Sequence, residues 1–429
     1  MGMVNRSIET RASLAVVGAG VAGCAVVAGL RQQGWLGSLS LWEMGRGPGG
    51  RSSARRSRQD PDLHINHGAP CFNLDSAALE LAPPRLLKPL LAGGWIEPWC
   101  GVMASLGVDG SLHPPLDSPL GRGQLFQGRG GMDQLCGGLL ALGDQLGPPI
   151  ERHFGTLVRH LSVTPAGRWR LQDAGGQLLD EVDWLVLSST LLAHPRALLV
   201  LGWQVIPLLE VARQLQDPQL DHALATIGSI RSVARSALLL VSGADAARHW
   251  QQLPFRLLEF DPPAQQRFGL SRLSIQPLED GRCVVVAHSS TVVAEEHLGV
   301  YGSRSAIALQ LGAGGAGERE QQLIAWLSEA LQQALADHLE PGLIGAADRQ
   351  LMRWGAAFPL QPGLPDALQL CAGSRIAFCG DAMAGPGFGR VEGAWRSGEA
   401  LAASLLPHLQ GRAPTPFPRA APSGQNPQG

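Results

Sequence analysis

The sequence predicts an α/β protein with two domains, one built on a parallel sheet flanked by helices and a smaller one with a mainly antiparallel sheet and helices. The first domain is indicated by two strand–turn–helix patterns with glycine-rich turns, one near each end of the chain. The second is indicated by alternating apolar strand patterns between about residues 190 and 345. A chain of 429 residues is long enough for two hydrophobic cores.

Composition excludes several classes of function. The formal net charge is −2, which gives no reason to expect a nucleic-acid partner or binding to an anionic membrane. The seven cysteines are odd in number and form no CxxC pair, so we expect neither a disulfide framework nor a metal site, and a reducing compartment fits better. The first apolar run is interrupted by regularly spaced glycines and is not a signal peptide or a membrane span. We therefore expect a cytoplasmic protein, and the sequence leaves its oligomeric state open.

The stretch LAVVGAGVAGCAVVAGL carries the first motif, a buried strand followed by GxGxxG and an apolar helix pattern. Gly18 is expected to permit the tight turn, Gly20 the approach of a pyrophosphate, and Gly23 the close packing of helix on strand. The helix would begin at Val21–Ala22 and direct its free N–H groups at the phosphates. The next strand pattern, SLSLWE, ends at Glu43, whose carboxylate is expected to accept hydrogen bonds from an adenosine ribose.

A second glycine cluster follows directly, in GRGPGGRSS. Gly49 and Gly50 would permit another close approach of the backbone, and Arg51 could pair with a diphosphate through two hydrogen bonds. A domain that binds NAD has no particular need for this cluster, whereas a domain that binds a longer dinucleotide does need it. The combination therefore predicts a Rossmann-type domain that binds FAD.

The second strand–turn–helix lies at the other end of the chain, in RIAFCGDAMAGPGFGRVEGAWRSGEALA. Asp381 would follow the strand at the carboxyl edge of the sheet, where it could accept hydrogen bonds from the ribityl hydroxyls of FAD. The helix would begin at Val391–Gly393 and point its positive end at the flavin. Further residues of the loop and helix predicted to bind the cofactor are Gly380, Gly389, Val391 and Gly393.

These motifs together resemble the FAD-dependent amine oxidase superfamily, and within it renalase and the bacterial renalase-like flavoproteins. INHGAPCF, FQGRGGMDQLCGGLLALG and LMRWGAAFPL are similar to further segments of that group in the same order, so the resemblance covers about residues 12–410. It implies that Gly68 and Ala69 lie beside the flavin and that Val158 contacts the adenine. It also implies oxidation of isomeric NAD(P)H with oxygen as the electron acceptor. The chain departs from the pattern at Asn66, at Cys71 and in a Gly-Pro-Gly-Phe insertion after Asp381.

The scarcity of two residue types bears on the substrate. The chain has one Tyr, so it cannot form the pair of tyrosines that flanks the flavin in monoamine oxidases, and its one Lys, Lys88, lies outside every flavin motif. The best prediction is an enzyme that transfers a hydride from a small reduced substrate, such as a reduced nicotinamide dinucleotide, to the flavin. Two alternatives remain: a related oxidoreductase acting on an amine or an apolar carotenoid-like molecule, and a flavin-binding redox module without turnover. The candidate catalytic residues are His67, Trp354 and Arg353, each of which has a purely structural alternative.

The expected domain boundaries follow from these assignments. The FAD-binding domain is expected to consist of three separate segments, residues 12–75, 121–190 and 346–410. The substrate domain would comprise residues 76–120 and 191–345. The tail, residues 411–429, is rich in Pro, Gly and polar residues and is expected to be disordered.

Overall fold

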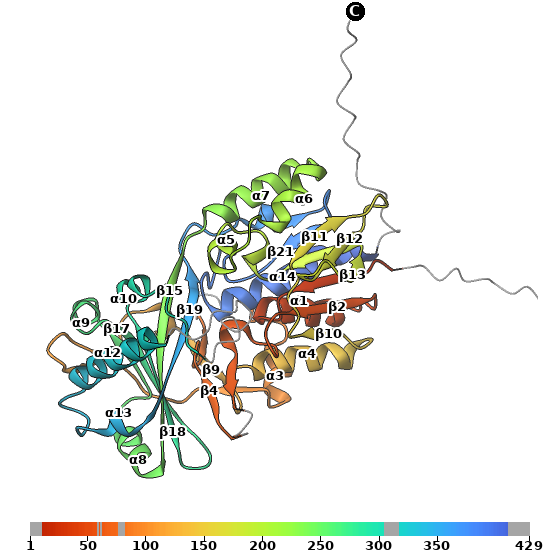
Figure 1. Ribbon diagram of the computed structural model, residues 1–429. Coiled ribbons are helices and arrows are strands. Elements are labelled where there is room, and N and C mark those ends of the chain that lie inside the picture. Colours follow the sequence, from red (N-terminus) through yellow and green to blue (C-terminus); the bar gives the residue numbers. More distant parts are fainter. Residues whose placement is uncertain (1–10, 58–59, 61, 76–81, 304–316, 411–429) are drawn as a thin grey trace, which may run out of the picture.

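A computed structural model describes residues 11–57, 60, 62–75, 82–303 and 317–410 of the chain. The predicted class is confirmed: a parallel sheet with helices forms one domain, and a larger, mainly antiparallel sheet forms the centre of the other (Figure 1). The prediction for the tail, residues 411–429, falls outside the described residues.

The first domain is built on a six-stranded sheet whose strand order is β10-β2-β1-β14-β21-β20. All neighbouring strands are parallel except β20, which pairs antiparallel with β21. The central strands are short apolar runs buried on both faces, as parallel strands between two layers must be. Their bounds are β1 Leu14–Val17, β2 Leu39–Glu43, β10 Glu151–Phe154, β14 Trp184–Leu187, β20 Leu370–Cys371 and β21 Ile376–Phe378.

Two layers cover this sheet. Helices α1, α4 and α14 pack on one face, with α1 in contact with both of the others. A three-stranded antiparallel sheet, β11-β12-β13, and helices α5, α6 and α7 pack on the opposite face. Their bounds are α1 Val21–Gln32, α4 Gln134–Leu146, α5 Arg196–Val200, α6 Pro207–Leu215, α7 Pro218–Ser229, α14 Val391–Gln410, β11 His160–Val163, β12 Trp169–Gln172 and β13 Leu178–Val182.

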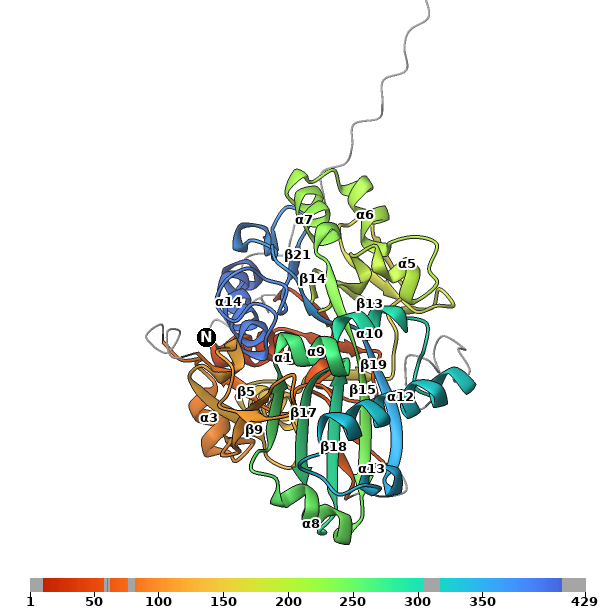
Figure 2. The ribbon, with the colours of Figure 1, turned by 90° about the vertical axis from the view of Figure 1, so that its left-hand side faces the viewer.

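The second domain is centred on a seven-stranded sheet in the order β19-β15-β18-β17-β16-β7-β8, antiparallel except for the pair β16–β7. Helices α8, α9 and α12 bury one face of this sheet (Figure 2). The bounds are β7 Met103–Leu106, β8 Leu112–His113, β15 Ser232–Ser242, β16 Leu257–Phe260, β17 Leu270–Pro277, β18 Cys283–Ser289, β19 Asp348–Pro359, α8 Ala244–Gln252, α9 Pro262–Phe268, α10 Thr291–Glu296, α12 Glu318–Ala334 and α13 Leu343–Ala346. The other face packs in part on the hairpin β3–β4 and otherwise contributes to a cavity wall.

Smaller elements complete the first domain. A three-stranded sheet, β5-β9-β6, and the short helix α3 pack near α4 and α14. Their bounds, with those of the hairpin, are β3 Ala54–Arg56, β4 His64–Asn66, β5 Phe72–Leu74, β6 Ile96–Pro98, β9 Gln124–Gly128 and α3 Leu87–Ala92.

Three segments pack in a different domain from the one expected. Residues 82–98 and 191–230 were expected in the substrate domain, but their apolar side chains belong to the two cores of the parallel sheet. Strand β19 was expected in the FAD-binding segment 346–410, but it pairs with β15 along the seven-stranded sheet. Since β19 and β15 are more than a hundred residues apart along the chain, and the other two segments pack on elements that are not their neighbours in sequence, local patterns did not indicate these contacts.

Helix α12 carries an apolar stripe that faces the core of the second domain. Leu323, Leu327 and Leu331 of that stripe are buried, whereas Trp326 is 44% exposed and its ring covers Gly269. Among the described residues, no helix combines the length and apolarity needed to cross a membrane.

Candidate functional site

A large cavity of about 1680 Å³ lies between the two domains and is lined by residues of both. Cavities of roughly 300–1,000 Å³ are usual for a drug-sized ligand, so this one has room for an extended ligand and a second, smaller molecule. Most of the residues predicted to bind a cofactor line it, although they come from opposite ends of the chain.

The turn between β1 and α1 has the geometry that the first motif predicts. Gly18 has φ of +107°, a conformation that favours glycine. A Cβ on Gly23 would lie 2.1 Å from the carbonyl oxygen of Gly18, so this glycine permits the close packing of α1. A Cβ on Gly20 would meet no atom within 4 Å, and Val21 and Ala22 line the cavity beside it. The turn therefore leaves open space at the start of the helix.

Glu43, at the end of β2, is held by the backbone on both sides. Its two carboxylate oxygens accept the N–H of Ala19 at 2.9 Å and that of Gly45 at 2.6 Å. Burial raises the pKa of Glu43, while the two N–H groups act in the opposite direction. Each oxygen can accept a further hydrogen bond, and the side chain lines the cavity, so an interaction with ribose hydroxyls stays a prediction. Val158, expected to contact adenine, is buried in the same wall, in the loop before β11 rather than within a strand.

The second glycine cluster lies against the first. The N–H of Gly49 donates to the carbonyl of Ala19 at 2.8 Å, and both Gly49 and Gly50 have positive φ. The segment Gly68–Ala69 packs on the same loop, with the N–H of Ala69 donating to the carbonyl of Arg51 at 3.2 Å. The fold thus brings three segments of the sequence prediction to one side of the cavity.

Arg51 and Asp381 join the two ends of the chain. The guanidinium donates from Nη1 to one carboxylate oxygen of Asp381 at 2.7 Å and from Nη2 to the other at 2.6 Å. The two residues were predicted separately, one for a diphosphate and one for ribityl hydroxyls. Their contact shows that the two glycine-rich motifs meet across the cavity.

The start of α14 lies beside the glycine-rich loop. The N–H of Gly393 donates to the carbonyl of Gly387 at 3.2 Å, and that of Gly389 donates to the carbonyl of Asp381 at 2.9 Å. Of the first three N–H groups of the helix, those of Val391 and Glu392 have no acceptor among the described residues. The expected positive helix end is therefore present, with two free donors rather than three. Gly380, with φ of +149°, begins the loop and lines the same cavity.

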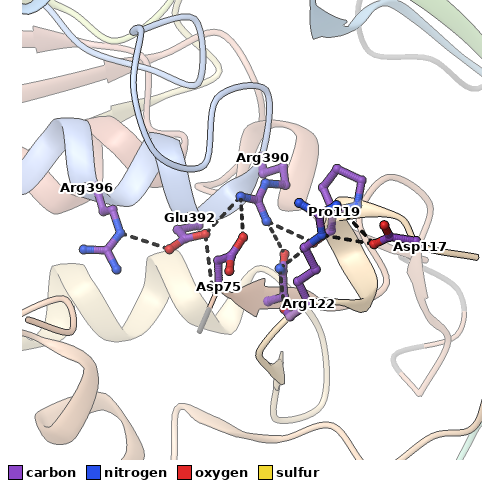
Figure 3. Close-up of polar contacts among 8 residues, drawn as sticks. Asp75, Asp117, Pro119, Arg122, Arg390, Glu392 and Arg396 are labelled. Atoms are coloured by element: carbon purple, nitrogen blue, oxygen red, sulfur yellow. Dashed lines mark hydrogen bonds and ion pairs between the residues drawn. The ribbon is translucent and has the colours of Figure 1, made fainter. Parts of the chain in front are cut away.

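An ion-pair network holds this helix end against the cavity rim (Figure 3). The fully buried Glu392 lies 3.3 Å from Nη2 of Arg390 and accepts from Nε of Arg396 at 3.0 Å. Arg390 also donates to the carbonyl of Pro119 at 3.1 Å and to Asn73 at 3.1 Å. A network of this kind fixes the orientation of the helix end, because each of its long side chains has several partners.

The candidate catalytic residues do not all come together. The rings of His67 and Trp354 stack with centroids 5.0 Å apart, and the indole N–H donates to the carbonyl of His67 at 3.3 Å. Arg353, the neighbour of Trp354 on β19, instead stacks on Tyr301 with its guanidinium 4.4 Å from the ring centroid. Its Nε and Nη1 are buried and have no hydrogen-bond partner within the described part of the chain. His67, Trp354 and Arg353 thus all line the cavity, but Arg353 is not part of the stack of His67 and Trp354.

Sequence reasoning missed several groups of the substrate-side wall. Arg235 and Arg272 line the cavity from β15 and β17, and Arg196 lies near Asp381. His288, on β18, lines the cavity as well. The available signal was a charged residue inside an apolar strand pattern, as in SVARSALLLVS. Among the residues that the structure describes, ten arginines and five carboxylates line the cavity, and no Tyr or Lys does.

Two buried histidines are expected to make stability fall at low pH. Burial, and then the charge of Arg55, lowers the pKa of His67 to about 4, and burial lowers that of His288 to about 3. Since a histidine in the unfolded chain titrates near 6.5, the unfolded state takes up protons first as the pH falls. Between pH 7 and 4.5, His67 alone should reduce the free energy of unfolding by about 2.5 kcal/mol.

Urea unfolding at both pH values measures this loss. The variant His67→Gln should lose less stability between pH 7 and 4.5 than the wild type, whatever its stability at pH 7. The exposed His222→Gln serves as the control and should keep the wild-type slope. An unchanged slope in His67→Gln would contradict the account of a neutral buried histidine.

Comparison with known proteins supports the fold. The model for the NAD(P)-binding Rossmann-like domain matches residues 16–81, and no curated protein sequence matches the chain significantly. Among solved structures, cyclohexylamine oxidase from Brevibacterium oxydans is 13% identical over 93% of this chain and 100% of its own, with a TM-score of 0.58. Wild-type putrescine oxidase bound to putrescine is 13% identical over 92% of this chain and 99% of its own, with a TM-score of 0.54. The chain therefore has a Rossmann-like domain within the same two-domain fold as these oxidases.

Proposed function

We propose that the protein is an FAD-dependent oxidoreductase of the amine oxidase superfamily. The observation that carries this proposal is the meeting of the two glycine-rich motifs on one cavity, joined by the bidentate pair of Arg51 and Asp381. Structural similarity to enzymes described as amine oxidases, and to a flavoprotein/dehydrogenase from Cytophaga hutchinsonii at a TM-score of 0.50, agrees with it.

The residues present fit FAD. The open space at Gly20 and the start of α1 suit a pyrophosphate, and the free acceptor positions of Glu43 suit a ribose. At the other end, the free N–H groups of Val391 and Glu392 would donate to an electron-rich edge of the flavin ring. FAD, when bound, supplies the acceptor for a hydride and passes the electrons on to oxygen.

This chain's own residues would bind and orient the substrate. His67 and Trp354 offer a stacked pair of rings on the substrate side, and burial keeps His67 neutral at pH 7. The wall around them carries arginines, which suits an anionic substrate and is unfavourable for a cationic amine. We propose a reduced nicotinamide dinucleotide, in an isomeric form of NAD(P)H, as the substrate and oxygen as the acceptor.

Two other functions would use the same cofactor site. A carotenoid-like substrate would need an apolar tunnel, whereas the described wall contains ten arginines and three histidines. A redox module without turnover would keep the cofactor site and would lack rapid reduction by any small molecule.

Anaerobic mixing with candidate reductants tests the proposal. The flavin absorbance should bleach rapidly with isomeric NAD(P)H and much more slowly with ordinary NAD(P)H, putrescine or cyclohexylamine. Rapid bleaching by an amine alone would overturn the nicotinamide substrate. A flavin that no reductant bleaches would instead favour the redox module.

A further inference from the structure

The face of the seven-stranded sheet turned toward the cavity carries a row of polar side chains. Arg272 on β17 pairs in register with His288 on β18 and with Glu259 on β16. Arg235 on β15 pairs in register with Trp354 on β19. All five residues line the cavity, so the two arginines share a wall with the stack of His67 and Trp354.

Arg272 is fixed in place without using most of its donors. Its Nη2 donates to the carbonyl of Gly68 at 3.2 Å and lies 3.3 Å from Nδ1 of His288. Nε2 of His288 lies 3.1 Å from the carbonyl of His67, which can only accept, so His288 is the neutral tautomer with its proton on Nε2. Nδ1 is then an acceptor for Arg272. Nε and Nη1 of Arg272 keep three N–H groups without a partner among the described residues.

Arg235 is held in a similar way. Its Nη1 donates to Thr291 Oγ1 at 2.6 Å and to the carbonyl of Ala234 at 2.9 Å, and its guanidinium lies 5.0 Å from the ring centroid of Phe358. Nε and Nη2 have no partner in the part of the chain that the structure describes. They form one edge of the guanidinium plane, the arrangement that pairs with two oxygens of a carboxylate or phosphate.

The charges of these two arginines are not paired within the protein. In the described residues, no carboxylate lies within salt-bridge distance of either guanidinium. Burial, and the nearness of the two charges to each other, lowers the pKa of Arg235 to about 10, so it stays charged at pH 7. Glu259 is the cross-strand neighbour of Arg272, and its carboxylate accepts from Ser118 Oγ at 2.9 Å. Two half-buried cations without a paired anion leave their charge uncompensated unless a ligand supplies the negative charge.

We propose that Arg235 and Arg272 form a binding site for an oxyanion of the substrate, a carboxylate or a phosphate, beside the stack of His67 and Trp354. The fixed guanidinium groups present donors on one wall, while the aromatic stack borders the same space. A substrate with a planar ring and at least one oxyanion matches both features. The inference deepens the proposed function and rests on it in placing the substrate on this side of the cavity.

Binding of aromatic probes to the purified protein tests the site. The probes are benzoate and phenyl phosphate, which carry the two kinds of oxyanion, and neutral benzamide as the control. Titration calorimetry measures their affinity and does not depend on flavin, and perturbation of the flavin absorbance reports binding next to the cofactor. We expect at least one anion to bind at least tenfold more tightly than benzamide. The anion that binds more tightly identifies the oxyanion that the site prefers.

Three variants assign the binding to these side chains. Arg235→Gln and Arg272→Gln should each lower the affinity for the preferred anion about 10- to 100-fold, which is the range for a lost hydrogen bond to a charged group. Neither variant should change the affinity for benzamide. The exposed Arg213→Gln on α6 should leave both affinities unchanged. If Arg272→Gln fails to fold, Arg235→Gln decides alone. Equal affinity for benzamide and the anions, or unchanged anion binding in the Arg235 variant, would overturn the site. Absence of flavin would instead count against the proposed function, because the calorimetric result stands without it.

Discussion

Replacing Gly393 with alanine is expected to lower the affinity for FAD by about tenfold or more. The added methyl group would lie 2.2 Å from the carbonyl oxygen of Gly387 and 2.6 Å from its carbonyl carbon. Both are backbone atoms, so a side-chain rotation cannot relieve the clash, and the start of α14 or the loop must move. Because Gly387 and Val391 line the cavity, this movement would displace the helix end proposed to contact the flavin.

The measurement is the flavin content of the purified variant, together with the dissociation constant from titration of the flavin-free protein. Gly345→Ala is a matched control, since a Cβ at Gly345 in α13 meets nothing within 4 Å. It should leave flavin binding unchanged. A Gly393→Ala protein with wild-type affinity would show that α14 does not touch the cofactor.

Replacing Asp381 with alanine is expected to weaken FAD binding about 10- to 100-fold and to slow reduction by the substrate. The carboxylate is predicted to accept hydrogen bonds from the ribityl chain, and it also holds Arg51 on the opposite side of the cavity. The effect on stability should be smaller, less than about 1 kcal/mol, because the side chain of Arg51 is 43% exposed and the pair is screened by water.

A second arginine–aspartate pair on the cavity rim provides the control. Arg122 also lines the cavity, and its partner Asp117 is 86% exposed. Asp117→Ala should change neither flavin binding nor the free energy of unfolding. Equal flavin affinity in the Asp381 and Asp117 variants would argue against the assigned role of Asp381.

The first domain could be predicted from the sequence because its motifs are local. Gly18, Gly20 and Gly23 lie within six residues, and the backbone geometry of this turn is what their spacing implies. Asp381 was also identified from its place after a buried strand. What the sequence did not show is that Asp381 bonds with Arg51, because that contact spans 330 residues.

The residues of the substrate-side wall were harder to predict from the sequence, because long-range strand pairing brings them together. Arg235 and Arg272 are single charges in apolar strands, and only the register of β15, β18 and β17 places them on one wall. Arg353 and Trp354 both line the cavity, but only Trp354 stacks on His67, because neighbouring side chains alternate between the two faces of β19. Domain boundaries at residues 191–230 and in β19 likewise depend on long-range packing.

The central claim, that both ends of the chain build one FAD site, is tested most directly by the flavin stoichiometry of the purified protein. The wild type, after incubation with excess FAD and removal of the unbound part, should show flavin absorbance bands and one FAD per chain. Glu43→Ala at one end and Asp381→Ala at the other should each lower this ratio while the chain remains folded. A folded wild-type protein that retains no FAD would contradict the account.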